Sequence, residues 1–368
     1  MFRLTAHPES MDAKVRPVRG ATLNHESARF NLPSTQVDGD WLDARDTIDG
    51  EAPKTRTTVM VEKPKTIIAR NQSPDIGFDR SINAYRGCEH GCIYCFARPT
   101  HAYHDLSPGL DFETKLFAKP DAATLLRAEL SKPRYAVAPI AMGTNTDPYQ
   151  PIESGWRITR QCIEVLAETR HPLMITTKSD RVRRDIDLLS GMAKDGLVSV
   201  MVSVTSLDPK VAMTVEPRAP RPARRLAAIK ALSEAGIPTI VSIAPVIPAI
   251  TDHEMEHILE AAADAGAAHA SYILVRLPFE VAPLFRAWLD EHFPDRAGKV
   301  MAIIREIRGG RDNDPNFHTR MRPQGAWADL LRTRFRIACR KTGLNERQWL
   351  NLRTDLFRPP EGAQMRLF

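Results

Sequence analysis

The feature that most constrains the fold is a regular alternation of short apolar runs with segments that have the pattern of helices. Each run is nearly continuous in apolar and β-branched residues, as expected for a strand that is buried on both faces of a sheet. The runs cover residues 135–142, 172–177, 198–204, 238–244 and 270–276. A sixth strand is expected just before residue 88. Repeated strand–helix units predict a parallel sheet with right-handed crossovers.

The segments between these runs carry helix boundary signals. Proline and acidic residues stand where a first helical turn favours them, and Gly236 and Gly266 stand where helices commonly end. We expect helices at residues 120–130, 153–169, 180–194, 222–235 and 252–265. About six βα units favour an α/β fold with an open or partial barrel, (β/α)6, over a closed eightfold barrel.

The two ends of the chain differ from this middle part. Residues 1–60 are polar and weakly periodic, so we expect a flexible extension that leads into a core at 61–295. Residues 296–368 are expected to form a basic helical region, with helices at 299–308 and 326–341 around a polar loop. Residues 296–358 carry a net charge of +9, against +6 for the whole chain. This excess indicates either a nucleic-acid or polyanion partner, or a solvated helical surface.

The chain shows no apolar run of membrane-spanning length and no secretory signal in its first residues. We therefore expect a soluble cytoplasmic protein without a membrane partner. Met1 and Met11 are both possible start positions.

Three of the five cysteines, Cys88, Cys92 and Cys95, fall within eight residues, while Cys162 and Cys339 lie far along the chain. An odd count with one tight cluster does not resemble a disulfide framework and indicates metal binding in a reducing compartment. Thiolates are the usual ligands of iron–sulfur clusters. One loop with this spacing can reach three irons of a cubane and leave the fourth iron open.

The spacing CxxxCxxC differs from the ferredoxin run, which supplies four cysteines, and from paired CxxC zinc sites. An alternative is a structural zinc site with the three cysteines and one histidine. His90, His101 and His104 are close enough in sequence to supply that fourth ligand.

Residues 86–96, RGCEHGCIYCF, resemble the signature of the radical S-adenosylmethionine (radical SAM) superfamily, with Tyr94 at its aromatic position. The resemblance extends over roughly residues 78–280. It implies a [4Fe–4S] cluster on Cys88, Cys92 and Cys95, with S-adenosylmethionine chelating the open iron. It also implies that an electron, from a low-potential donor such as flavodoxin or ferredoxin, cleaves this cofactor to a 5′-deoxyadenosyl radical. The protein would supply binding, orientation and exclusion of water.

Residues 143–153, GTNTDPYQPIE, resemble the spore photoproduct lyase-like branch of that superfamily, and the basic tail resembles an uncharacterised bacterial subgroup of it. In spore photoproduct lyases a cysteine near the end of the second strand returns a hydrogen atom to the repaired thymine. Residues 141–147 contain no cysteine. DNA lesion reversal by that route is therefore not expected, and the substrate stays open, with nucleic acid as a candidate.

Polar residues at the carboxyl ends of the expected strands are candidates for binding the cofactor, because ligands of parallel α/β folds lie there. Each also has a structural alternative, such as a helix cap or a surface lysine. The candidates are Tyr94, Asn145, Thr146, Asp147, Lys178 and Ser203, with Thr205 as a further polar strand end.

Other residues near these candidates are interpreted differently. Glu89 and His90 are expected in a solvated loop, and Tyr149 is expected in the core. Tyr85 is equally compatible with packing and with the site. Arg276, after the sixth strand, faces either the site or a partner chain.

The leading hypothesis is therefore a radical SAM enzyme with an unknown substrate. A non-catalytic, metal-stabilised nucleic-acid-binding protein is the alternative. An iron–sulfur electron carrier is a third possibility, which three clustered thiols fit poorly.

Overall fold

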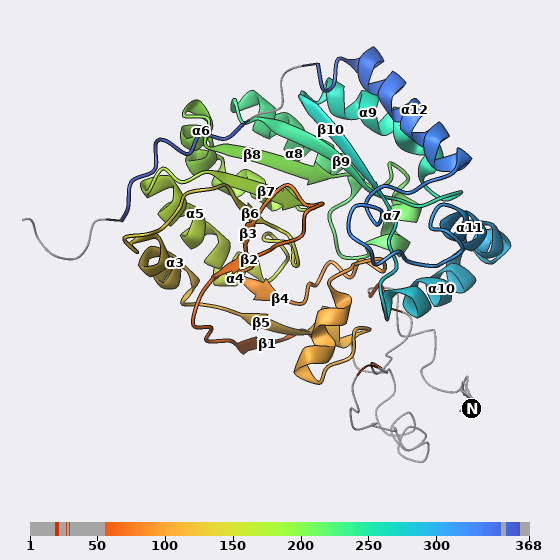
Figure 1. Cartoon of the computed structure of the whole chain (residues 1–368), viewed down its shortest axis with the longest axis horizontal. Helices are drawn as coiled ribbons and strands as arrows, with labels where there is room; N and C mark the ends of the chain where they lie inside the picture. The colour runs from red at the N-terminus through yellow and green to blue at the C-terminus, as the bar shows by residue number, and fades with distance from the viewer. Residues whose placement is uncertain (1–18, 22–26, 28, 30–55, 347–350, 361–368) are drawn as a thin grey trace, which may run out of the picture.

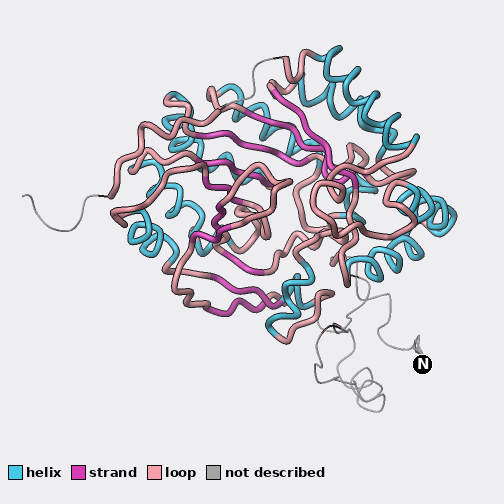
Figure 2. Tube along the Cα trace, viewed as in Figure 1, coloured by secondary structure: helices cyan, strands magenta, loops and turns pink. Residues whose placement is uncertain are grey.

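The computed structural model describes residues 19–21, 27, 29, 56–346 and 351–360, and these form two sheets surrounded by helices (Figure 1). Figure 2 shows the strands in the interior and most helices around them. The expected N-terminal extension lies largely outside the described residues. The boundaries expected at residues 60 and 295 stay a prediction.

The larger sheet has seven strands in the order β10-β9-β8-β7-β6-β3-β2. All neighbouring pairs from β3 to β10 are parallel, and β2 is antiparallel to β3 at one edge. The six expected parallel strands are thus confirmed, whereas the closer description as a partial barrel stays a prediction. The strands are β2 (Ile68–Arg70), β3 (Arg80–Ile82), β6 (Ile140–Met142), β7 (Leu173–Thr177), β8 (Val198–Ser203), β9 (Thr239–Val246) and β10 (His269–Leu274).

Helices connect successive parallel strands, and most lie where the sequence predicts them. Among the helices that the structure describes after residue 120, two were not predicted: α7 (Pro209–Val215) before α8, and α10 (Val281–His292) after β10. The others are α3 (Ala122–Leu130), α4 (Glu153–Trp156), α5 (Ile158–Glu168), η3 (Asp180–Asp185), α6 (Ile186–Lys194), α8 (Pro222–Glu234), η4 (Asp252–Glu254), α9 (Met255–Asp264), α11 (Pro294–Glu306) and α12 (Ala326–Thr342).

Two elements differ from the prediction for local reasons. The strand expected at 135–142 is regular only over Ile140–Met142. Pro139 has no N–H to donate, and the Ala136 carbonyl accepts a hydrogen bond from the Arg80 guanidinium instead. The single helix expected at 153–169 is split at Arg157, whose φ of 53° places it in the left-handed region.

A second, three-stranded sheet of order β1-β5-β4 was not predicted. It consists of β1 (Thr58–Val61), β5 (Lys115–Ala118) and β4 (Tyr85–Arg86), with η2 (Arg98–His104) and α2 (Asp111–Thr114) between β4 and β5. β4 ends two residues before Cys88. This small sheet therefore fixes both ends of the segment that carries the three cysteines.

Two large apolar clusters form the core. The first fills the space between the seven-stranded sheet and helices such as α3, α5, α8 and α9. The second joins α10 and α11 to the loops at the carboxyl ends of the strands, and it includes Ile93, Val215, Val275 and Leu277. Ile93 lies between Cys92 and Cys95 in the chain. The second cluster therefore anchors the cysteine loop against the carboxyl side of the sheet.

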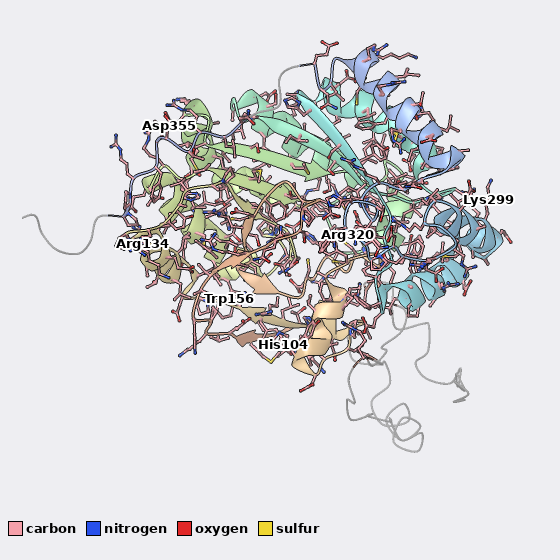
Figure 3. The ribbon with its side chains drawn as sticks, viewed as in Figure 1. His104, Arg134, Trp156, Lys299, Arg320 and Asp355 are labelled. Atoms are coloured by element: carbon pink, nitrogen blue, oxygen red, sulfur yellow. The ribbon has the colours of Figure 1, made fainter. Side chains whose placement is uncertain are left out.

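An ion pair links the two edges of the seven-stranded sheet. Asp75 lies in the loop between β2 and β3, and Arg320 lies in the segment that follows α11 near β10. The Arg320 Nη2 is 2.6 Å from the Asp75 Oδ1, and the Arg320 Nε is 2.7 Å from the Asp75 Oδ2. Figure 3 shows Arg320 near the middle of the view. The loops from opposite edges thus meet.

The C-terminal region is only partly helical. α12 packs along α9, and residues 351–360 form an extended strap that passes α6 (Figure 1). The strap donates backbone hydrogen bonds from Arg353 to Gly196 (3.0 Å) and from Arg358 to Thr169 (2.9 Å). None of the helices formed by the described residues has the length and apolarity to cross a membrane.

Candidate functional site

The three cysteines lie on the loop after β4, at the carboxyl side of the parallel sheet. Cys88 and Cys92 are buried, Cys95 is half-buried, and all three thiols are free of disulfides. Backbone hydrogen bonds within the loop run from Cys95 to Cys92 (3.2 Å) and from Arg98 to Cys95 (3.1 Å). The loop thus turns tightly, so that its thiols come from one short segment.

The thiols are buried, and burial opposes their ionisation. Burial raises the pKa of Cys92 to about 12, with Glu216 as a further cause. Burial also raises the pKa of Cys88, and the neighbouring Asp147 and Cys92 add to the shift. Because metal binding requires thiolates, loading these cysteines with a metal would release protons.

Arg98 stabilises the conformation of the cysteine loop through hydrogen bonds to its backbone carbonyls. Its guanidinium is fully buried and donates to the carbonyls of Cys92 (2.9 Å) and Gly91 (3.2 Å), and to Glu113 (2.6 Å). Two further donations reach the carbonyls of Pro108 and Gly109, at 3.0 Å and 2.9 Å. A charged group that satisfies several carbonyls at once makes the loop rigid.

Gln150 fixes the first half of the same loop. Its side chain accepts a hydrogen bond from the Glu89 N–H (2.9 Å) and donates one to the Gly87 carbonyl (3.1 Å). The expectation that Glu89 and His90 lie in a solvated loop is wrong. Both are buried, Glu89 in an ion pair with Arg218 (3.1 Å). The loop folds inward because its carbonyls and side chains are satisfied from the protein side.

Asp147 connects the cysteine loop to the end of β7. Its carboxylate accepts hydrogen bonds from the Thr177 hydroxyl (2.7 Å) and the Lys178 N–H (2.7 Å), and it lies 3.5 Å from the His90 Nδ1. Burial alone would raise the pKa of Asp147, but His90 and the two hydrogen bonds lower it to about 2. The carboxylate is therefore ionised and positions neighbouring loops.

Four polar side chains form a network beside Cys92. The Tyr94 hydroxyl donates to Glu216, which also pairs with the buried Arg225, and the Lys178 Nζ lies 5.7 Å from the centre of the Tyr94 ring. Although burial opposes its charge, Cys92 and Glu216 raise the pKa of Lys178. Lys178 therefore carries a positive charge next to the thiols.

The remaining predicted residues surround this network. Asn145 is exposed, and its N–H donates to Asn83 (3.0 Å). Thr146 is buried and donates to the Tyr85 carbonyl (3.3 Å). Ser203 is buried, and its carbonyl accepts a hydrogen bond from Arg225 (3.2 Å). A role of any of these side chains in binding the cofactor stays a prediction.

Other residues near the site are buried and contact the interior of the protein. Tyr85 is fully buried and donates to Glu153. Tyr149 and Cys162 are also fully buried, which confirms the expected core position of Tyr149. Thr205 donates to Glu216 (2.6 Å).

The sequence analysis missed Glu216, Arg225, Arg98 and Gln150. They lie in loops or at helix starts rather than at strand ends, and their importance comes from partners far along the chain. A buried arginine or glutamate requires a partner. No local pattern in the sequence, however, shows which charged residues become buried.

Histidines near the cysteines are engaged elsewhere. The His101 Nε2 lies 2.9 Å from the Lys115 carbonyl, and burial lowers the pKa of His101 to about 4. Within the part of the chain that the structure describes, no three or more His, Cys, Asp or Glu side chains have the geometry of a site for one metal ion.

The residues present fit a cluster with a bound cofactor. Three free thiols come from one loop, and a cationic lysine and an aromatic ring stand next to them. Such a donor set is typical of iron–sulfur ligation, and an ammonium can pair with a carboxylate.

A rigid cysteine loop and a charged network at the carboxyl edge of a parallel sheet are typical of α/β proteins, whose ligands lie at that edge. Residues 82–262 match the model of the radical SAM superfamily. The chain belongs to this superfamily and is an enzyme of the radical SAM class.

Its similar proteins include an uncharacterised protein of Mycobacterium tuberculosis, 38% identical over 242 residues, which are 64% of this chain and 71% of that protein. An uncharacterised protein of Methanocaldococcus jannaschii is 28% identical over 214 residues, 58% of this chain and 76% of that protein.

Two solved structures share the fold. Spore photoproduct lyase complexed with a dinucleoside spore photoproduct has a TM-score of 0.56 at 17% identity, covering 81% of this chain and 85% of that one. A double mutant of the same enzyme with bound AdoMet and dinucleoside spore photoproduct has a TM-score of 0.54 at 17% identity, covering 84% and 86%. These likenesses confirm the expected α/β fold.

Proposed function

We propose that this enzyme holds a [4Fe–4S] cluster on Cys88, Cys92 and Cys95 and cleaves S-adenosylmethionine reductively. The observation that carries the proposal is the rigid loop that brings three free thiols next to the charged network of Tyr94, Lys178 and Glu216. When bound, the cluster would supply one electron to S-adenosylmethionine, and cleavage of its carbon–sulfur bond would give methionine and a 5′-deoxyadenosyl radical.

The residues of the chain position the cofactor and exclude water. Lys178 pairs with the cofactor carboxylate, and Tyr94 packs beside the adenine. Asn145, Thr146, Asp147 and Ser203 stand at the ends of β6 and β8, where polar groups meet the rest of the cofactor. The Asp147 carboxylate already accepts three hydrogen bonds from the protein, which supports a positioning role for this residue.

The charge of the C-terminal region and the expected compartment indicate candidates for the substrate and the partners. The basic C-terminal region keeps nucleic acid as a candidate substrate. The electron is expected to come from a low-potential donor such as flavodoxin or ferredoxin. We expect the protein to lie in the cytoplasm, because cysteines stay reduced in that compartment. Membership in an enzyme superfamily favours this proposal over the non-catalytic alternative.

The test is anaerobic reconstitution of the full chain, followed by iron and sulfide analysis. We expect about four irons per chain and broad absorption near about 400 nm. With dithionite and S-adenosylmethionine, the protein should form 5′-deoxyadenosine.

Single variants Cys88→Ala, Cys92→Ala and Cys95→Ala should lose the iron, whereas the matched control Cys162→Ala, at a fully buried cysteine of α5, should retain it. Iron retained in the first three variants, or a fully loaded cluster that gives no 5′-deoxyadenosine, would contradict the proposal.

A further inference from the structure

Two arginines beside β10 lack carboxylate partners. Arg276 follows the strand, and its Nη1 contacts only the Met321 sulfur (3.4 Å), while its Nε has no hydrogen-bond partner. Arg308 is 6% exposed, and its Nε is also without a partner. The Arg308 Nη2 donates to the Val275 carbonyl (2.8 Å). Among the residues that the structure describes, no carboxylate lies within 4.0 Å of either guanidinium.

The nearby acidic residues are already engaged. Asp75 accepts both hydrogen bonds of the Arg320 fork, at 2.6 Å and 2.7 Å. The Asp314 carboxylate accepts from the Asn316 N–H (2.9 Å). A buried and a half-buried guanidinium that no carboxylate contacts are therefore left next to each other, with Asp314 acting on both only from a longer distance. Such an arrangement costs free energy in a folded protein.

The electrostatics agree with this geometry. Burial lowers the pKa of Arg308 to about 10, with the repulsion of Arg276 as the next cause. Burial and then the charge of Arg320 lower the pKa of Arg276. Strongly perturbed charged groups that have no structural partner are candidates for ligand binding.

The arginine pair lies at the carboxyl end of β10, on the same side of the sheet as the cysteine loop. Val275 and Leu277, the neighbours of Arg276, pack in one apolar cluster with Ile93 of that loop. A cleft of about 720 Å³ runs along β10 and is lined by residues that include Met321, the residue that Arg276 contacts. Met321 thus lies between this cleft and Arg276.

We propose that Arg276 and Arg308 bind a phosphate group of the substrate at the entrance to the site. Arg276 would offer the planar fork of donors that matches phosphate oxygens. Both Nη atoms of Arg308 already donate to carbonyls, so Arg308 would add its free Nε and its positive charge. The assignment of this phosphate to the substrate rests on the proposed function, whereas the binding of phosphate to the two arginines is independent of it.

The test uses the purified full chain, with and without reconstituted cluster, and inorganic phosphate as the probe. Phosphate should raise the Tm in a saturable manner beyond potassium chloride of equal ionic strength. Arg276→Met should weaken the phosphate Kd by roughly tenfold or more, since it removes a charged hydrogen-bonding group. Arg276→Lys, which keeps the charge but not the fork, should lie in between. The matched control Arg336→Met, at an exposed arginine of α12, should bind as the wild type does.

A second readout separates ligand binding from a structural role. In phosphate-free buffer, Arg276→Met should have an unchanged or higher Tm, because it removes a charge without a carboxylate partner. A large fall of the Tm, no phosphate effect in the wild type, or an equal effect in Arg276→Met would each overturn the proposal. These readouts do not depend on cofactor cleavage, so this proposal and the proposed function can fail separately.

The source of the phosphate is distinguished by two further probes. A single-stranded oligonucleotide that binds more tightly than a nucleoside monophosphate, and loses this advantage in Arg276→Met, supports a nucleic-acid phosphate. Equal binding of both, with the same sensitivity to Arg276→Met, supports a small phosphorylated substrate.

Discussion

At the scale of single residues, the site depends on charged groups that are buried in pairs. Asp147 joins His90 of the cysteine loop to Thr177 and Lys178 at the end of β7. Glu216 joins Tyr94 to Arg225. The spacing of the cysteines predicted their loop, and strand-end position placed Asp147 and Lys178 near it. Neither could reveal Glu216 and Arg225, because their partners are distant in the chain.

Asp147 should make stability depend on pH. Its pKa is lowered from 3.8 to about 2, so its contribution is present above about pH 4 and is lost as the pH falls towards 2. A shift of this size corresponds to about 2 kcal/mol. Asp147→Asn should therefore be less stable than the wild type by about 2 kcal/mol at pH 7. This difference should shrink as the pH falls, to about 1 kcal/mol or less at pH 2.5.

Urea unfolding followed by circular dichroism from pH 7 to pH 2.5 checks this. The exposed Asp290→Asn on α10 is the control and should follow the wild type. A stability difference that does not change with pH would show that the carboxylate charge is not the cause.

The Glu216–Arg225 pair should show strong coupling. Glu216→Gln or Arg225→Met alone leaves one buried charge unpaired and should lower the free energy of unfolding by about 3–5 kcal/mol. The double variant Glu216→Gln/Arg225→Met should lose much less than the sum of the single losses. A double-mutant cycle from denaturant unfolding measures the coupling, and additive effects would contradict a direct pair.

At the scale of elements, the strands buried on both faces were predictable, because short, continuous apolar runs between helical segments are typical of parallel strands. The small sheet β1-β5-β4 was not, since its strands have only two to four residues and pair across distant segments. Gly143, which follows β6, shows how closely neighbouring elements approach. Its φ is +89°, and a Cβ there would lie 1.9 Å from the Thr176 carbonyl oxygen of β7.

Gly143→Ala should therefore destabilise the protein by more than about 2 kcal/mol, since both the backbone conformation and the contact oppose a side chain. Gly191→Ala is the matched control. Gly191 lies in α6, and a Cβ there would meet nothing within 4 Å. This control should gain about 0.5–1 kcal/mol. Thermal unfolding measures both, and equal effects of the two changes would contradict the close approach.

At the scale of the whole molecule, the last described segment connects separate βα units. The centre of the Phe357 ring lies 5.6 Å from the centre of the Tyr135 ring and 5.5 Å from that of the His171 ring. Tyr135 precedes β6, and His171 precedes β7. The basic composition of this region predicted helices and a charged surface. It could not predict an extended strap, because the strap depends on rings contributed by distant loops.

Phe357→Ala should lower the free energy of unfolding by about 1–3 kcal/mol, because a half-buried ring loses its aromatic contacts. The exposed Ile337→Ala on α12 should change stability little. Protease digestion and denaturant unfolding check the result. An unchanged stability of Phe357→Ala would mean that the strap does not hold these loops together.

The buried Arg98 has a consequence for how the protein acquires its inorganic group. Small zinc domains derive their fold from the metal itself, and they unravel when a chelator removes it. In this enzyme the Arg98 guanidinium already donates hydrogen bonds to the backbone carbonyls of Cys92 and Gly91. If the cysteines hold iron as proposed, its loss to oxygen or a chelator should therefore leave an ordered loop that can bind iron again without refolding.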